Sequence, residues 1–199
     1  MENIGKEYAV HFIPRNELVI SGIGDSFVWN QSEVLTQFIS PWNPDDFSKI
    51  EFRALWDGVY LYFCFTVFDS EIYIDNKDAT VESIGNSDRV ELFFRPNDSL
   101  NPYYCLEIDT AARIMDFKAY PNLNFDFKWN WPQNEIMIKS SIQKDRFVVE
   151  GAISIASLKQ LDLIHENKIE AGGTSSFNWI RWLGCDCRNL ATYRCKQPF

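Results

Sequence analysis

The sequence has few of the residues that usually carry catalysis or phosphate recognition. Only two histidines occur among its 199 residues, and neither stands in a recognisable motif with a serine or a cysteine. No glycine-rich phosphate loop and no dinucleotide-binding fingerprint is present. The residues therefore give no support to a hydrolase triad or to a nucleotide-dependent activity.

Long hydrophobic runs and positive charge are also scarce. The longest apolar stretch, Val59 to Phe68, has the length of a strand and is too short to cross a bilayer. Asp and Glu number 28 against 19 Lys and Arg, which gives a formal net charge of -9. We therefore expect neither a nucleic-acid nor a membrane partner, because phosphates and anionic lipids would be repelled. The oligomeric state stays open.

The first residues, Met1 to Glu7, contain no apolar segment of the kind found in signal peptides. This predicts a cytoplasmic protein, or a secreted or periplasmic one if a leader has been removed.

Five cysteines leave at least one thiol without an intrachain partner. Cys64 and Cys105 lie inside apolar segments and are expected to be small buried hydrophobes. Cys185, Cys187 and Cys195 lack the paired spacing of a zinc site, and a reducing compartment is the simpler interpretation.

What the chain does contain is aromatic residues, 16% of the total, and strand-like segments separated by turn signals. The predicted strands are residues 8–13, 34–39, 49–55, 59–68, 89–94, 103–109, 113–120, 135–142, 147–153 and 177–183. Residues 157–163 are the one expected short helix. The pattern predicts an all-β fold, a single antiparallel β-sandwich of immunoglobulin or jelly-roll type over residues 1–199.

The sequence allows more specific predictions for two of these strands. The segment 59–68 is apolar on both faces, which predicts a central strand covered on each side. Gly151 interrupts the strand 147–153, which indicates either a bulge or a close approach of another segment.

Charged side chains alternate with the apolar ones on several strands. Glu51, Arg53, Arg89, Glu91 and Glu107 are predicted on the polar faces of neighbouring strands. They could pair with one another across strands, or hydrogen-bond the hydroxyls of a sugar whose rings stack on aromatics.

Glu91 and Glu107 could also be the carboxylate pair of a glycosidase. The arginine neighbours are expected to lower both pKa values, whereas an acid catalyst needs a raised pKa. This weighs against a glycosidase without excluding it.

Two loops are unusual. The acidic loop from residue 69 to 86 offers oxygen ligands for calcium, unless its side chains are simply solvated. These carboxylates are Asp69, Glu71, Asp75, Asp78 and Glu82. The loop from residue 121 to 133 holds Phe125, Phe127, Trp129 and Trp131, which form either a binding surface or a cap on the core.

The order and spacing of several segments resemble the family 9 carbohydrate-binding modules over residues 29–199. The matching segments are Ala54 to Tyr62 with the turn Trp56-Asp57-Gly58, Val67 to Asp69, Ser87 to Phe94, Tyr104 to Asp109, and Asp145 to Ile153 followed by Ser157-Leu158. The resemblance implies a β-sandwich that binds sugars, often beside calcium. Such modules accompany xylan-degrading enzymes and are not themselves catalytic.

The resemblance also implies site residues. Glu91 is similar to a sugar-contacting glutamate of the family, and Tyr193-Arg194 resembles an aromatic-arginine pair near its C-terminus. Gly85 stands where the family has a stacking tryptophan, and Glu107 where it has a sugar-contacting arginine. The expected carbohydrate-binding residues are Glu91, Arg89, Tyr193, Arg194, Trp42, Trp129 and Trp182, with metal ligands unassigned.

The sequence thus predicts a non-catalytic domain that binds a xylan-like or glucan-like carbohydrate. An interaction domain that has lost the sugar site is the first alternative, favoured by Gly85 and Glu107. A glycoside hydrolase and a haem module are the others, and the latter would need axial ligands from Met115, Met137 or His11.

Overall fold

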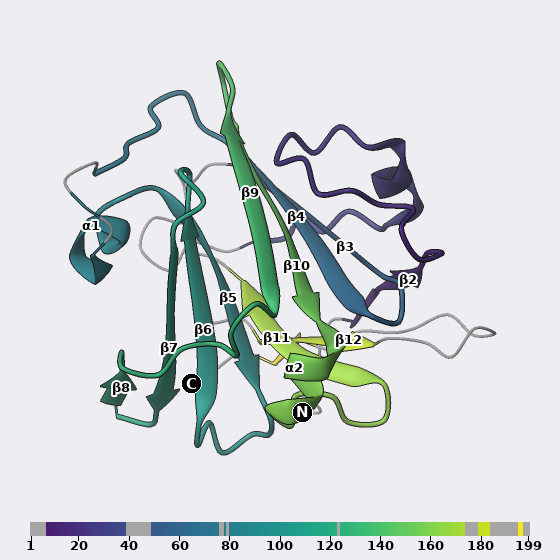
Figure 1. The fold of residues 1–199 in the computed structure, drawn as a ribbon, viewed down its shortest axis with the longest axis vertical. Helices are drawn as coiled ribbons and strands as arrows, with labels where there is room; N and C mark the ends of the chain where they lie inside the picture. The colour runs from purple at the N-terminus through teal and green to yellow at the C-terminus, as the bar shows by residue number, and fades with distance from the viewer. Residues whose placement is uncertain are drawn as a thin grey trace.

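The chain forms two β-sheets (Figure 1). Because side chains alternate along each strand, each sheet has an apolar inner face, and the two inner faces pack together. The computed structural model describes residues 7–38, 49–75, 78, 80–122, 124–173, 179–183 and 195–196; residues 7, 173, 179–183 and 195–196 are described by their backbone alone.

The larger sheet has eight strands. Their order is β1 (Glu7–Ala9), β12 (Trp179–Leu183), β11 (Lys168–Gly173), β5 (Arg89–Arg95), β6 (Tyr103–Asp109), β7 (Ile114–Tyr120) and β8 (Asn124–Asp126), with β13 (Cys195–Lys196) paired to β12. The smaller sheet has the order β2 (His11–Phe12), β3 (Lys49–Trp56), β4 (Tyr60–Phe68), β10 (Phe147–Ser154) and β9 (Ile136–Ile142). The short helices are η1 (Phe27–Gln31), α1 (Val81–Gly85) and α2 (Ile155–Gln160).

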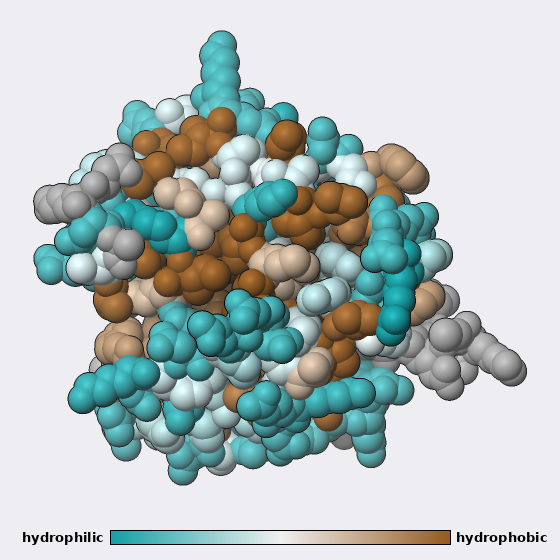
Figure 2. Space-filling model, viewed as in Figure 1, coloured by the Kyte–Doolittle hydropathy of each residue, from teal (hydrophilic) through white to brown (hydrophobic). Residues whose placement is uncertain are grey.

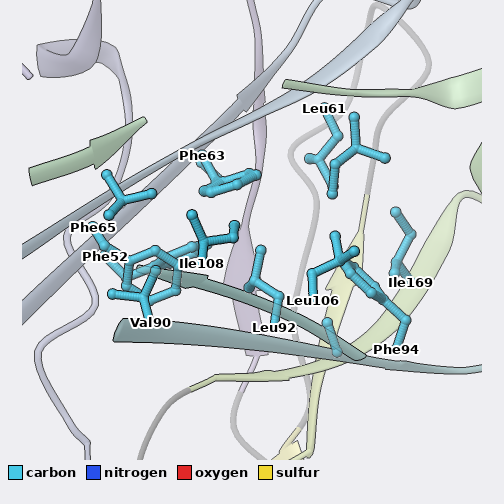
Figure 3. Close-up of a cluster of buried hydrophobic side chains, with 14 of the residues drawn as sticks. Phe52, Leu61, Phe63, Phe65, Val90, Leu92, Phe94, Leu106, Ile108 and Ile169 are labelled. Atoms are coloured by element: carbon cyan, nitrogen blue, oxygen red, sulfur yellow. The ribbon is translucent and has the colours of Figure 1, made fainter. Parts of the chain in front are cut away.

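The core lies between the two sheets, where large apolar side chains meet (Figure 3). Phe63 and Phe65 of β4 and Phe94 and Leu106 of the larger sheet are fully buried. Burying each such side chain stabilises the fold by about 1.5–3 kcal/mol. These contacts decide which face of each strand points inward.

Residues 13–29, called the covering segment below, pack on the outer face of the smaller sheet. Tyr62 and Cys64 of β4 pack there against Leu18, Val28 and Trp29. The prediction that β4 is a central strand covered on each side is therefore confirmed. Cys64 is a free, buried thiol, as is Cys105 on β6.

Gly151 is a site of close approach. Strand β10 keeps an unbroken register with both β4 and β9, so there is no bulge. A Cβ atom added at Gly151 would overlap the ring of Phe63 and the side chain of Ile138. A larger residue does not fit here, because the side chains of the paired residues on β4 and β9 fill the space above Gly151.

A buried carboxylate fastens the covering segment to the sheet. Glu150 on β10 is 0% exposed. It accepts hydrogen bonds from the backbone N and the hydroxyl of Ser21 (both 2.9 Å), from Gly22 N, and from Trp29 Nε1 (2.7 Å). A carboxylate can be buried when its oxygens accept several hydrogen bonds of this kind.

The predicted fold class is confirmed, with differences in detail. The pairs β1–β12 and β2–β3 are parallel, and the other strand pairs are antiparallel. The described part of the predicted strand 34–39 makes only one bridge, between Leu35 and Phe52. Two short α-helices are present instead of one, since α1 lies in the predicted acidic loop. The described helices are all too short and too polar to cross a membrane.

Hydrophobic residues gather in the middle of the face on which β7 and β9 lie, with hydrophilic residues around them (Figure 2). Strand β9 is the edge of the smaller sheet. The exposed large hydrophobic side chains on these two strands are Ile114, Met137 and Ile142.

We predict that Glu150→Gln lowers the free energy of unfolding by about 2–4 kcal/mol, because an amide cannot accept all the hydrogen bonds that the carboxylate does. Urea unfolding measures the change. Glu17→Gln, at an exposed position in the same covering segment, is the control. Equal losses in the two variants would show that Glu150 does not anchor the segment.

Candidate functional site

Arg89, Glu91 and Glu107 meet on the outer face of the larger sheet and are called the Arg89 cluster below. Glu91 on β5 pairs in register with Glu107 on β6. Their sequence neighbours Val90 and Ile108 point to the opposite face of the sheet, into the core, and are fully buried. The prediction that these three charged residues lie on neighbouring strands is confirmed.

Two further residues of that prediction lie elsewhere. Glu51 and Arg53 are on β3 in the other sheet, so their grouping with Arg89 was wrong. Glu51 pairs with Lys49 at 2.7 Å, and Arg53 Nη1 donates to Trp29 O at 3.2 Å. Alternation predicts the face of a strand but not which sheet contains it.

Arg89 joins the two carboxylates of the cluster. Its Nε lies 2.5 Å from Glu107 Oε2 and its Nη2 lies 3.0 Å from Glu91 Oε1. Its Nη1 donates to the carbonyl oxygens of Gly85 at 2.7 Å and Ser87 at 3.5 Å. The side chains of Arg89 and Glu91 are 27% and 21% exposed and that of Glu107 is 10% exposed, so a ligand reaches the first two more easily.

The electrostatics of the cluster differ from the prediction. Burial, with the charge of Glu91, raises the pKa of Glu107 to about 7, although Arg89 acts in the opposite direction. Burial also raises the pKa of Glu91. Arg89 does act to lower both pKa values, as expected, but burial outweighs it, so the net shift of both pKa values is upward.

A free space borders the cluster at the end of α1. Thr80 caps this helix by accepting a hydrogen bond from Ser83 N, and Gly85 is its last residue. A Cβ atom added at Gly85 would meet nothing within 4 Å. The space beside Gly85 therefore has room for a larger side chain.

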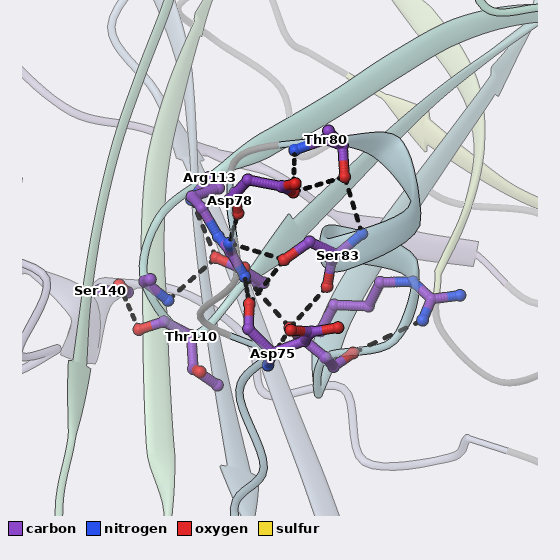
Figure 4. A network of polar contacts seen from close by, with 11 residues as sticks. Asp75, Asp78, Thr80, Ser83, Thr110, Arg113 and Ser140 are labelled. Carbon is purple, nitrogen blue, oxygen red and sulfur yellow. Dashed lines mark hydrogen bonds and ion pairs between the residues drawn. The ribbon is translucent and has the colours of Figure 1, made fainter.

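Arg113 holds the acidic loop against the sheet (Figure 4). Its Nε pairs with Asp109 at 2.6 Å, its Nη2 donates to Asp75 O at 2.9 Å, and its Nη1 donates to Asp78 O. The hydroxyls of Ser83 and Ser87 accept from the same guanidinium at 3.0 and 3.1 Å. The carbonyl and hydroxyl oxygens of the loop at this point therefore already accept hydrogen bonds from the Arg113 guanidinium.

This arrangement bears on calcium. Within the described part of the chain, no three His, Cys, Asp or Glu side chains are grouped in a way that could hold a metal ion. The described loop residues thus do not form a donor set that fits calcium, and calcium binding stays a prediction of the sequence.

Trp129 and Trp131 pack against the core and not against the Arg89 cluster. Trp129 packs on Tyr104 with ring centroids 5.0 Å apart, and Trp131 is buried against Phe94, so both cap the core. Trp182 pairs in register with Tyr8 and Ile169, which are core residues. Trp42, Tyr193 and Arg194 lie outside the described residues.

Aromatic residues beside the larger sheet form a separate group. Phe127 and Phe125 are 47% and 39% exposed, and they pack on Phe117 of β7 with ring centroids 4.9 and 5.6 Å away. The sequence indicated these exposed rings through their place in an aromatic loop. It did not indicate Arg113 or the carbonyls of Gly85 and Ser87, because those contacts depend on the path of α1.

The haem alternative is not supported by the positions of its proposed ligands. His11 and Met137 lie on opposite edge strands of the smaller sheet, and Met115 lies on the larger sheet. Met115 is buried on the outer face among Phe93, Cys105 and Phe117. His11 and Met137 are therefore separated by the width of the smaller sheet, and neither shares a sheet with Met115.

We predict a pH-dependent stability that originates in Glu107. The folded protein holds a proton on this residue up to about pH 7, whereas the unfolded chain, with an ordinary pKa of 4.5, has lost it. The stabilisation is fully present below pH 4.5 and disappears as the pH rises through about 7.

Glu107→Gln is expected to remove this slope, by up to about 1.4 kcal/mol per pH unit. Urea unfolding across this pH range measures it, with Glu51→Gln as the control. Parallel curves for the wild type and Glu107→Gln would contradict the prediction.

Comparisons with known proteins identify the family and the fold. A family model described as "Carbohydrate family 9 binding domain-like" matches residues 20–171. None of the curated proteins compared with the chain matches it.

Solved structures share the fold. A family 9 carbohydrate-binding module from Caldicellulosiruptor kristjanssonii in complex with glucose has a TM-score of 0.53 at 17% identity, over 92% of this chain and 83% of that chain. The cellotriose complex of such a module from the same organism gives 0.53 at 16% identity, over 92% and 82%. A candidate carbohydrate-binding protein from Bacteroides uniformis gives 0.61 at 12% identity, over 96% and 94%. At these identities the structures establish the fold, and the family model, which covers most of the sequence, shows that the chain belongs to the carbohydrate family 9 binding domain-like family.

Proposed function

We propose that this protein binds carbohydrate without catalysing a reaction, and that the Arg89 cluster is the binding site. The observation that carries the proposal is the meeting of Arg89, Glu91 and Glu107 on a sheet face in a chain of this family. Charged groups of this kind hydrogen-bond sugar hydroxyls.

A glucan-type ligand is the first to test. The solved family 9 modules that share the fold are complexes with glucose and with cellotriose. A xylan-type ligand follows from the sequence resemblance alone. Calorimetric titration with cellotriose and xylotriose, each with and without calcium, separates the two ligands and tests the calcium prediction. Binding of neither trisaccharide would contradict a glucan-type and a xylan-type ligand alike.

An interaction domain is the second candidate, favoured by the surface of β9. This edge strand leaves Met137 and Ile142 46% and 50% exposed. An unpaired apolar edge is a common site of contact with another chain. Absence of any sugar response would favour this candidate, and hydrolysis of a chromogenic glycoside would instead favour a glycosidase with Glu91 and Glu107.

We predict that Glu91→Ala weakens sugar binding about tenfold or more while the fold persists, because Glu91 offers an accessible charged acceptor. Titration calorimetry gives the affinity, and a melting temperature close to that of the wild type verifies the fold. Glu51→Ala removes a similarly exposed glutamate from the other sheet and serves as the control. Unchanged affinity in Glu91→Ala would remove this residue from the site.

Gly85→Trp is predicted to strengthen sugar binding. The space beside Gly85 is open, and an indole there would stack on a sugar held by the Arg89 cluster. An aromatic contact of this kind is worth about 0.5–1.5 kcal/mol, or roughly two- to tenfold in affinity. Gly85→Ala changes the backbone preference without adding a ring, so it is the matched control. Equal affinities of the two variants would place the sugar elsewhere.

A further inference from the structure

The Arg89 cluster is rich in acceptors and poor in donors. A guanidinium has five N–H groups. Arg89 directs its Nε to Glu107, its Nη1 to the carbonyls of Gly85 and Ser87, and its Nη2 to Glu91. At most one N–H of Arg89 is therefore left to bind a ligand.

The carboxylates of Glu91 and Glu107 can still accept further hydrogen bonds. Glu91 contacts Arg89 through Oε1, and Glu107 contacts it through Oε2. The thiol of Cys105 lies 4.0 Å from Glu107 Oε1 and is a weak donor. Among the described residues, one oxygen of each carboxylate thus has no strong donor.

The charges around the cluster are also unbalanced. Arg113, which also donates to the Ser87 hydroxyl, is already paired with Asp109 at 2.6 Å. Among the described groups, Arg89 alone faces Glu91 and Glu107, so a surplus of one negative charge arises when Glu107 loses its proton. The negative charge of the whole chain, -9, acts in the same direction.

We propose that the Arg89 cluster prefers a sugar that carries an ammonium group and discriminates against anionic sugars. This inference rests on the proposed carbohydrate-binding function and specifies its ligand class. An ammonium supplies three N–H donors and a positive charge, which matches the two free carboxylate oxygens and the charge surplus. A uronate would bring acceptors and negative charge to a site that already has both in excess.

The test compares four monosaccharides that share one ring: glucosamine, glucose, N-acetylglucosamine and glucuronate. Their affinities are measured by calorimetric titration of the full chain near neutral pH, where the amino sugar is largely charged and Glu107, with a pKa of about 7, can ionise. We expect glucosamine to bind about tenfold more tightly than glucose, and glucuronate more weakly than glucose. The advantage of glucosamine should shrink with added salt.

N-acetylglucosamine tests the role of the charge, because acetylation keeps the nitrogen and removes its charge. It should lose the advantage of glucosamine. Glu107→Gln should bring the affinity ratio of glucosamine to glucose towards one, whereas Glu51→Gln on the other sheet should leave that ratio unchanged. Glucosamine binding should also release protons, measured as a dependence of the heat on the buffer, because a cation favours ionised Glu107.

The outcomes distinguish the two proposals. Glucose binding with no preference for glucosamine, or with equal binding of glucuronate, overturns the ammonium inference and leaves carbohydrate binding intact. No response to any of the four sugars, nor to cellotriose or xylotriose, overturns both.

Discussion

The alternation of side chains along β5 and β6 is the constraint on which the rest of the site depends. Packing Val90, Leu92 and Phe94 into the core leaves Arg89 and Glu91 only the outer face of the sheet. The same packing on β6 turns Glu107 outward, opposite Glu91. A shift of the register by one residue would bury these charges and expose the core, so the stability of the sandwich and the geometry of the cluster are enforced together.

Neighbouring polar groups then determine what the cluster can do. The carbonyls of Gly85 and Ser87 occupy one end of Arg89, and its partner carboxylates occupy the rest. Arg113 in turn holds the loop that carries α1, through the carbonyls of Asp75 and Asp78. The position of α1, and with it the open space at Gly85, therefore depends on a second arginine. Both guanidinium groups serve the protein's own acceptors, so the proposed ligand contacts fall to the carboxylate oxygens of Glu91 and Glu107.

The other sheet shows a different use of a buried charge. Glu150 lies on the outer face of β10, fully covered by the segment that it binds. There the carboxylate is saturated by donors from Ser21, Gly22 and Trp29, whereas Glu91 and Glu107 share one donor residue. Saturated carboxylates organise the fold, and incompletely paired ones remain able to bind a ligand.

The sequence by itself determined most of the strands, though not β8 or β11, and also the sandwich class and the outward position of Arg89, Glu91 and Glu107, because a two-residue period of polar and apolar side chains is a local property. It also indicated the close approach at Gly151. It did not determine that Glu51 and Arg53 belong to the other sheet, that α1 forms in the acidic loop, or that Trp129 caps the core. Those outcomes depend on which strands pair and on contacts between residues far apart in the chain. The raised pKa of Glu107 was decided by the tertiary structure for the same reason, since its burial and the neighbouring charge of Glu91 arise only when β5 and β6 come together.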